Sequence, residues 1–393
     1  MDKRRISRAD ANIIETPYFL IEESSIESNL KILDKIQQES GCKILLALKA
    51  FAMSSTFPLI SEYLHGVCAS GLNETLLGKE FGKEVHTYSP AFKESEFNKI
   101  LEHSDYIIFN TIEQYKRFKQ KINNSGKEVK LGLRVNPETS FPKAKFEIYN
   151  PCSQNSRLGI TSDSLKGQTL EGITGLHFHA LCEQGSSELE TALQSFEEKF
   201  YKQIKKMEWV NFGGGHNITR EDYDRTKLID LIKNFRRKFP NIKDVYIEPG
   251  EAVVLNSGIF IASVLDFVYK KDKTIAITDA SAEAHLIDVL ITKHEPKQWI
   301  PEILGSGTTE EHKYNYIISG LSCAAGDIIG EYAFKHPLKR GDRLAFKDAA
   351  HYTIVKMNMF NGINLPTLVI KRKNGDIKIV RQFDFEDYKR LMG

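Results

Sequence analysis

The sequence predicts a (β/α)8 barrel joined to a mostly β domain that is built from the C-terminal third of the chain. Eight short apolar runs alternate with helix-length segments between residues 43 and 248, which is the pattern of a parallel sheet closed into a barrel. After Gly250 the pattern changes to strand-like runs rich in β-branched residues. Several of the eight runs end in a residue suited to chemistry, and the carboxyl ends of barrel strands form the active face of this fold.

The N-terminal segment begins with a strand at 16–22 and a helix at 27–39, in which apolar residues recur at helical spacing. Barrel strands are expected at 43–49, 66–70, 84–89, 105–110, 130–136, 172–180, 208–213 and 244–248. Helices are expected at 73–81, 113–122, 187–206 and 227–239. The connection 137–171 is long, and long connections at a barrel's active face are often functional.

The C-terminal third predicts a second, β-rich domain. Strands are expected at 253–270, 274–279, 343–347, 367–373 and 377–381. Residues 374–376 read Asn-Gly-Asp, which is a strong hairpin signal between the last two strands. We expect the N-terminal strand to join this sheet. The predicted domains are therefore a barrel at 25–255 and a β-rich domain formed by 1–24 and 256–393.

Composition limits the classes of partner. The 54 basic and 52 acidic residues nearly cancel, so charge favours neither nucleic acid nor a membrane surface as a partner. No apolar run approaches the ~18 residues of a membrane span, and no signal peptide is expected. The five cysteines show no CxxC spacing, which argues against a disulfide framework or a metal site such as zinc. A cytoplasmic location fits this usage.

Three features among the barrel strands indicate pyridoxal phosphate chemistry. Lys49 closes the first strand, where desolvation can lower the pKa of an amine that forms a Schiff base; the alternative is a lysine that snorkels to solvent. Gly213, Gly214 and Gly215 lie between a strand and a helix, where bare N–H groups can hold a phosphate, although three glycines can also form a plain turn. Glu248 ends the eighth strand, and its alternative is a solvated acid in a turn.

An imidazole and a guanidinium complete the set of candidates in the barrel. His177 and His179 close the sixth strand, and we expect one of them to point outward with a structural role. A packed core histidine is the alternative for either residue. Arg134 lies in the fifth strand, where a structural salt bridge is as good an interpretation as a role near the cofactor.

The segment from Ala47 to Phe51 resembles the cofactor-lysine segment of the fold-type III pyridoxal phosphate decarboxylases, which include ornithine and diaminopimelate decarboxylases. The resemblance implies that Lys49 binds the cofactor and that His179 stacks on its ring. It also implies that Glu248 faces the pyridine nitrogen and keeps it protonated. Ornithine-type members usually have a phosphate-binding arginine where this chain has Glu251, so other donors must serve that group.

The β-rich domain carries the rest of the resemblance. Residues 319–327 resemble the family loop whose cysteine, here Cys323, reaches the partner subunit's site and helps to protonate the product carbon. By the same resemblance Asp327 contacts the distal amine of the substrate, and Tyr352 lies near the phosphate and the substrate. Glu283 is a further candidate for binding a cationic substrate. The alternatives are an inert buried thiol for Cys323, a core position for Tyr352 and an exposed acid for Glu283. The resemblance also implies a homodimer with shared active sites.

Several segments narrow the resemblance to one group within the family. Residues 156–159, 177–183 and 323–327 are similar to those of carboxynorspermidine decarboxylases, which also act on carboxyspermidine. The expected reaction gives norspermidine or spermidine in bacterial polyamine synthesis. A decarboxylase or racemase of another basic amino acid, or a non-catalytic binding homologue, remains an alternative. One methylene separates the two expected substrates, which is worth only ~1–3 kcal/mol in a pocket.

Overall fold

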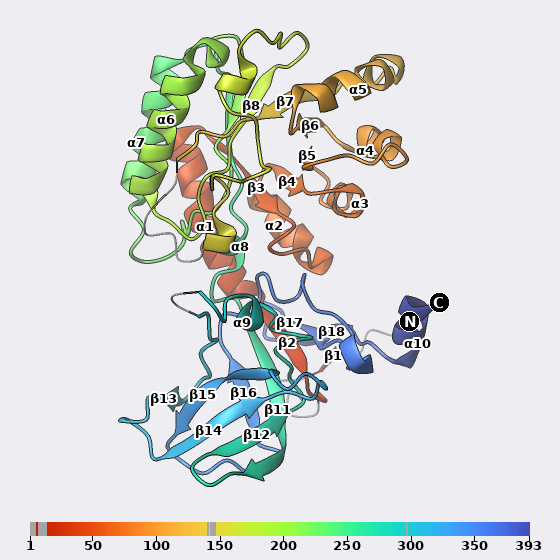
Figure 1. The fold of residues 1–393 in the computed structure, drawn as a ribbon, viewed down its shortest axis with the longest axis vertical. Helices are drawn as coiled ribbons and strands as arrows, with labels where there is room; N and C mark the ends of the chain where they lie inside the picture. The colour runs from red at the N-terminus through yellow and green to blue at the C-terminus, as the bar shows by residue number, and fades with distance from the viewer. Residues whose placement is uncertain (1–4, 7–13, 140, 142–146, 296–297) are drawn as a thin grey trace. The chain divides into compact units, whose positions relative to one another are not determined.

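The structure of this chain, a computed structural model, describes residues 5–6, 14–139, 141, 147–295 and 298–393, and these form two compact units (Figure 1). Residues 27–253 make one unit, called the barrel unit below. The described residues up to Ile26 and those from Val254 to Gly393 make the other, called the β-rich unit. The predicted fold class, a (β/α)8 barrel with a mostly β domain, is confirmed.

Eight parallel strands close the barrel, in the order in which the sequence predicts them. The circle closes where Tyr246 of the last strand pairs with Lys43 of the first. The strands are β3 (Lys43–Ala47), β4 (Gly66–Ala69), β5 (Glu84–Tyr88), β6 (Tyr106–Phe109), β7 (Lys130–Arg134), β8 (Gly175–His177), β9 (Trp209–Asn211) and β10 (Asp244–Ile247). All eight are shorter than predicted, because the last residues of the predicted strands leave the ladder to form the loops of the active face.

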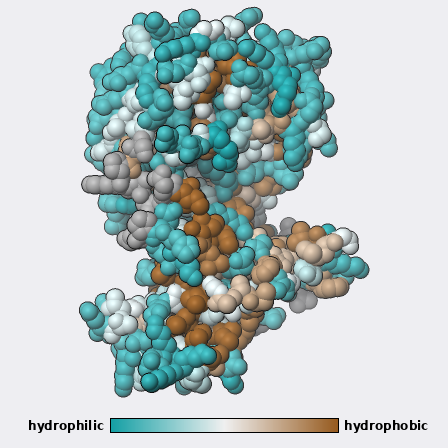
Figure 2. Space-filling model, viewed as in Figure 1, coloured by the Kyte–Doolittle hydropathy of each residue, from teal (hydrophilic) through white to brown (hydrophobic). Residues whose placement is uncertain are grey.

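Helices follow most of the strands. They are α1 (Glu23–Ser40), α2 (Phe57–Tyr63), α3 (Leu72–Lys79), α4 (Phe97–His103), α5 (Ile112–Asn124), α6 (Ser186–Ile204), α7 (Arg225–Lys238) and α8 (Glu251–Val254). The sequence did not predict α2 and α4, which are only two turns long. Side chains cap two of the others: Thr111 accepts the N–H of Gln114 at α5, and Asp224 accepts that of Lys227 at α7. The face of this unit that is seen in Figure 2 is mostly hydrophilic, as solvated helix faces should be.

Large side chains fill the interior of the barrel. Leu45, Tyr106, Ile108, Trp209 and Tyr246 form one buried cluster. A barrel filled in this way is a packed core rather than a pore. Ligands therefore have to bind at the rim, and the candidate residues of the barrel unit gather at the carboxyl ends of its strands.

The β-rich unit is built on one sheet of ten strands, with the order β1-β18-β17-β2-β11-β12-β14-β15-β13 and with β16 beside β11. The N-terminal strand β2 (Tyr18–Glu22) pairs with β11 and β17, so the prediction that it joins this sheet is confirmed. The other strands are β1 (Arg5–Ile6), β11 (Gly258–Tyr269), β12 (Thr274–Thr278), β13 (Ser306–Gly307), β14 (Tyr314–Ser319), β15 (Ile328–Phe334), β16 (Arg343–Phe346), β17 (Thr367–Lys371) and β18 (Ile377–Arg381). Two helices, α9 (Asp288–Ile291) and α10 (Phe385–Met392), complete the unit.

One prediction in this part of the chain was wrong in detail, and some strands were not predicted. The strand expected from residue 253 begins only at Gly258, because the preceding residues form α8. The sequence did not predict β14 and β15, whose hairpin carries the loop with Cys323. In the described parts of the chain, no helix is long and apolar enough to cross a membrane.

Candidate active site

Lys49 emerges at the carboxyl end of β3. The strand ends at Ala47, and a tight turn follows in which Ala50 and Phe51 donate their N–H groups to the carbonyl of Ala47. Leu48 and Ala50 are buried on either side, whereas the side chain of Lys49 is exposed. The buried neighbours thus fix the backbone that presents the amine. The expected desolvation is not seen in the single chain, because the described residues of the barrel unit leave this side chain exposed.

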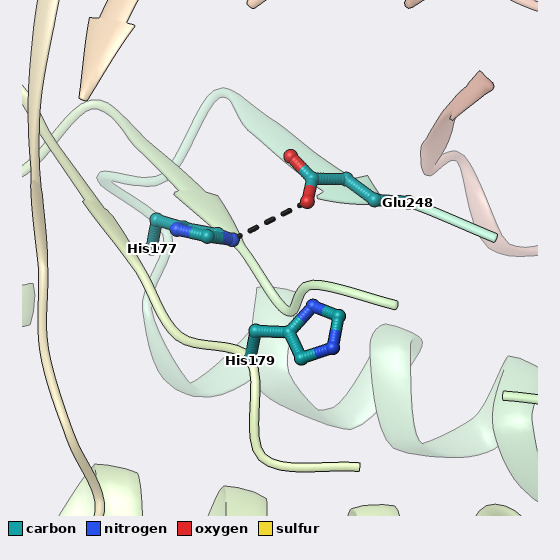
Figure 3. A group of neighbouring side chains, drawn as sticks. All are labelled: His177, His179 and Glu248. Carbon is teal, nitrogen blue, oxygen red and sulfur yellow. Dashed lines mark ion pairs between the residues drawn. The ribbon is translucent and has the colours of Figure 1, made fainter. Parts of the chain in front are cut away.

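Glu248 is a buried carboxylate at the end of β10. One oxygen accepts a hydrogen bond of 2.6 Å from the amide of Asn211, which is itself fully buried. The other oxygen lies 3.4 Å from Nε2 of His177 (Figure 3). Burial alone would raise the pKa of Glu248, but the imidazole of His177 and the charge of Lys49 lower it, so the group is ionised at neutral pH.

Both histidines of the sixth strand contribute to this site, so the expectation that one points outward was wrong. Residues two apart in an extended chain share one face, which the prediction overlooked. His177 is 2% exposed, and in the described part of the chain neither of its ring nitrogens has a hydrogen-bond partner. One ring nitrogen of His177, one of His179 and one carboxylate oxygen of Glu248 lie within 4.8 Å of one another, and Figure 3 shows the three side chains.

His179 lies just beyond β8 and faces the glycine turn. Its Nδ1 accepts the N–H of Gly214 at 3.1 Å. Burial lowers the pKa of His179 well below its usual range, and the charges of Lys49 and Arg134 lower it further. The ring is therefore neutral, and because Nδ1 is an acceptor, we assign the proton to Nε2.

Arg134 contacts residues at the ends of two other barrel strands. The guanidinium lies over the ring of Tyr88, 4.6 Å from its centroid, and donates to the carbonyl of His179 at 3.3 Å. The side chain is 6% exposed. Through these two contacts Arg134 connects β5, β7 and the end of β8. The contacts are with a ring and a carbonyl, whereas the alternative considered from the sequence was a salt bridge with a carboxylate.

The glycine turn after β9 leaves no room for side chains. A Cβ on Gly214 would lie 2.2 Å from the carbonyl oxygen of Glu248, and one on Gly215 would lie 2.0 Å from that of Leu181. Gly213 and Gly215 also have positive φ, 74° and 83°. The expected helix does not follow directly, because a loop precedes α7, which begins at Arg225. The turn therefore offers backbone groups without the help of that helix N-terminus.

Four other candidates lie in the β-rich unit, and three of them are not fully buried. Cys323 is exposed in the β14–β15 loop, and its N–H donates to Oδ1 of Asn361 at 2.7 Å. Tyr352 has φ of 54°, a conformation that is strained for an aromatic residue and that clusters at functional sites. Glu283 is half-buried, and its carbonyl accepts a 2.9 Å hydrogen bond from the amide of Asn358.

The geometry of Asp327 does not suit its expected contact with a substrate amine. Its side chain is 2% exposed. The carboxylate already accepts hydrogen bonds from Ser281, Ala282 and Ser322. A buried carboxylate that has three donors would lose them on binding a ligand, so the contact with a substrate amine stays a prediction that this geometry does not support.

Two residues near Glu248 were missed from the sequence. Asn211 was missed because it was treated as part of the apolar run before the glycines, although a polar residue at the end of a barrel strand is itself a signal. Cys68 of β4 was treated only as one cysteine of five. Burial raises the pKa of its thiol well above the usual range, and the negative charge of Glu248 raises it further, so Cys68 stays protonated.

A family model described as "Pyridoxal-dependent decarboxylase, C-terminal sheet domain" matches residues 32–350. The chain belongs to this family. It is a pyridoxal phosphate-dependent carboxy-lyase, and the predicted cofactor and enzyme class are confirmed.

Relatives cover nearly the whole chain. A carboxynorspermidine/carboxyspermidine decarboxylase of Campylobacter jejuni is 44% identical over 382 residues, which are 95% of this chain and 98% of the relative. A carboxyaminopropylagmatine decarboxylase of Synechocystis is 37% identical over 97% of this chain and 96% of the relative. The crystal structure of carboxynorspermidine decarboxylase from Campylobacter jejuni, complexed with norspermidine, is 42% identical and superposes with a TM-score of 0.86 over 96% of this chain and all of that one.

More distant structures share the fold. Diaminopimelate decarboxylase from Helicobacter pylori, at 18% identity, has a TM-score of 0.80 and covers 96% of this chain and 97% of its own.

The barrel residues fit the cofactor of this decarboxylase family. Lys49 offers an amine at the rim, Glu248 is an ionised buried acid, and the glycine turn is a cradle that a single Cβ would fill.

Proposed function

We propose that this decarboxylase acts on carboxynorspermidine and carboxyspermidine and releases norspermidine and spermidine. The observation that carries the proposal is the 44% identity, over almost the full length of both chains, to the Campylobacter jejuni enzyme named for these two substrates. The likeness to the norspermidine complex supports the same substrate class. The product is a linear polycation, so its binding surface should present carboxylates, and Glu283 is a candidate.

Residues of the barrel unit prepare the site for this reaction. Pyridoxal phosphate, when bound, supplies a ring that accepts the electron pair left behind as CO2 departs. Lys49 would hold the cofactor through its side-chain amine. Glu248 would keep the pyridine nitrogen protonated, because the carboxylate is ionised and one of its oxygens is bonded by Asn211. His179 is neutral and adds no positive charge to the site.

Cys323 then completes the proton balance in the proposed reaction. Its thiol gives a proton to the carbon that has lost CO2, and the thiolate regains one from solvent. We propose that this cysteine comes from the partner subunit of a homodimer, as the family resemblance implies. We also propose a cytoplasmic location, which is supported by the free thiols of all five cysteines.

The substrate is tested by measuring CO2 release from purified enzyme. The panel is carboxynorspermidine, carboxyspermidine, carboxyaminopropylagmatine, diaminopimelate and ornithine. We expect the two carboxy-triamines to be turned over with the highest kcat/KM. A preference for carboxyaminopropylagmatine would move the assignment to the activity named for the Synechocystis relative. Turnover of ornithine or diaminopimelate alone would contradict the proposed substrate class.

Shared active sites are tested by mixing two inactive variants. Lys49→Ala and Cys323→Ala chains that exchange subunits randomly should regain about a quarter of the wild-type activity, because half of the dimers are mixed and each mixed dimer has one intact site. No recovery, with subunit exchange verified by mass, would contradict the shared site. Full activity of a monomer would contradict it as well.

A further inference from the structure

The loop between β14 and β15 carries both Cys323 and Asp327, and the two residues lie in opposite environments. Cys323 is exposed near the tip, whereas Asp327 is 2% exposed at the base, just before β15. The burial of this carboxylate beside a loop with an exposed thiol needs a physical explanation, because burial of a charge is costly unless hydrogen bonds compensate for it.

Hydrogen bonds supply that reason. Oδ1 of Asp327 accepts the N–H of Ala282 at 2.7 Å. Oδ2 accepts the hydroxyl of Ser281 and the N–H of Ser322, each at 2.9 Å. Two of these donors belong to the segment that leads to Glu283, and the third directly precedes Cys323. One side chain therefore ties two segments that carry candidate site residues.

The base of the loop closes tightly around this side chain. The N–H of Gly320 and the hydroxyl of Ser319 both donate to the carbonyl oxygen of Asp327, at 3.0 Å and 2.8 Å. A Cβ on Gly320 would lie 2.5 Å from one carboxylate oxygen of Asp327 and 2.7 Å from the other. Glycine at this position thus makes room for the carboxylate under the loop.

A third segment completes the arrangement. Asn361 accepts the N–H of Cys323 at 2.7 Å, and Asn358 donates to the carbonyl of Glu283 at 2.9 Å. The segments 281–284, 319–327 and 358–361 are therefore joined by three side chains, of which Asp327 makes the most bonds. Hydrogen bonds therefore tether the loop at Ser322, at Cys323 itself and at its base at Asp327.

We propose that Asp327 is a positioning residue that fixes the loop of Cys323, and that it does not bind the distal amine of the substrate. The proposal rests on the proposed function, in which Cys323 delivers a proton to the product carbon. Any carboxylate that binds the distal amine must then be a different one.

The test compares Asp327→Asn and Asp327→Ala with Asp342→Asn as a control. Asp342 also accepts a backbone N–H, that of Lys339 at 2.7 Å, but it lies in a turn before β16. Amide hydrogen exchange is measured on the purified enzymes, peptide by peptide, together with kcat and KM for carboxynorspermidine. We expect exchange in 281–284 and 319–324 to rise on the order of tenfold or more in Asp327→Ala and less in Asp327→Asn, which keeps one acceptor. Peptides of β2 and β11 should not change, and kcat should fall far more than KM rises.

Two results would overturn the proposal. Unchanged exchange with a large rise in KM would assign Asp327 to the distal amine. Faster exchange in every peptide would leave it only a general role in stability. Failure of the proposed function is a separate result: a wild type that releases no CO2 from the carboxy-triamines refutes that function, while the exchange data still decide how the loop is held.

Discussion

Asn211 makes the shortest hydrogen bond to the acid of the site, and its replacement tests how Glu248 stays ionised. In Asn211→Leu the carboxylate loses a 2.6 Å bond, and the N–H of Gly213 loses its 2.8 Å acceptor. A hydrogen bond to a charged group is worth about 1.5–3 kcal/mol, so we expect the pKa of Glu248 to rise by about one to two units. The wild-type pKa is lowered to about 2, because the effect of burial, which raises it, is outweighed by His177 together with His86 and Lys49.

The sign of the pH effect follows from that lowered pKa. Ionisation of Glu248 stabilises the folded protein above about pH 4.3, where the same group ionises in the unfolded chain, and this stabilisation is lost as the pH falls through the folded-state pKa. Asn211→Leu brings the two pKa values closer together and so removes part of the stabilisation at neutral pH. Denaturant unfolding of the cofactor-free protein at pH 7.5 measures the loss.

A double-mutant cycle isolates the charged contact. A hydrogen bond to a neutral amide is worth about 0.5–1.5 kcal/mol. The loss of unfolding free energy caused by Asn211→Leu should therefore be about 1–2 kcal/mol smaller in a Glu248→Gln background than in wild type. Asn110→Leu is the matched control: Asn110 is also buried in the barrel unit and bonds Tyr88, Arg157 and Gly159, with no carboxylate among these partners. A coupling energy near zero for Asn211, or an equal coupling for Asn110, would show that this bond does not help to keep Glu248 ionised.

Three further substitutions test other parts of the site. Gly215→Ala should lower the free energy of unfolding by about 3 kcal/mol or more, because it strains the backbone and brings a Cβ within 2.0 Å of a carbonyl oxygen. Gly126→Ala, with φ of 66° and open space around it, should lower it by only about 1–2 kcal/mol. Equal losses in denaturant unfolding would contradict the close packing of the glycine turn. Arg134→Lys keeps the charge but loses the planar stack on Tyr88, so we expect weaker cofactor retention on dialysis than in wild type, and unchanged retention would show that charge alone matters. Tyr352→Asn suits a positive φ better, so it should stabilise by up to about 1 kcal/mol in thermal unfolding while CO2 release falls; unchanged activity would remove Tyr352 from the site.

Much of the fold was predictable because each barrel strand is a local apolar run. Runs such as 43–47 and 244–247 are recognisable without any tertiary information, and their alternation with helices indicates the barrel. Two-turn helices such as α2 and α4 carry too few periodic positions to be recognised. The strands β14 and β15 depend on pairing with each other and with β12, which no local pattern records.

Some residues of the site could likewise be predicted from the sequence, and others could not. Lys49, His179 and Glu248 could be found because each ends a strand on the face where a barrel places its chemistry. The pairing of Asn211 with Glu248 could not be found, since it joins residues 37 apart in the sequence. For Asp327 the motif implies a role in binding, whereas its three internal donors become visible only once the segments 281–282 and 319–327 are brought together.

The most direct test of the proposed function pairs purified wild type with Lys49→Ala. Each protein is incubated with pyridoxal phosphate, reduced with borohydride and digested, and CO2 release from carboxynorspermidine and carboxyspermidine is measured in parallel. We expect a reduced cofactor adduct on the peptide that contains Lys49, CO2 from both substrates in wild type, and neither signal in the variant. An adduct elsewhere, or CO2 release that survives in Lys49→Ala, would contradict the role of Lys49. An adduct on Lys49 without CO2 from either substrate would contradict the proposed reaction.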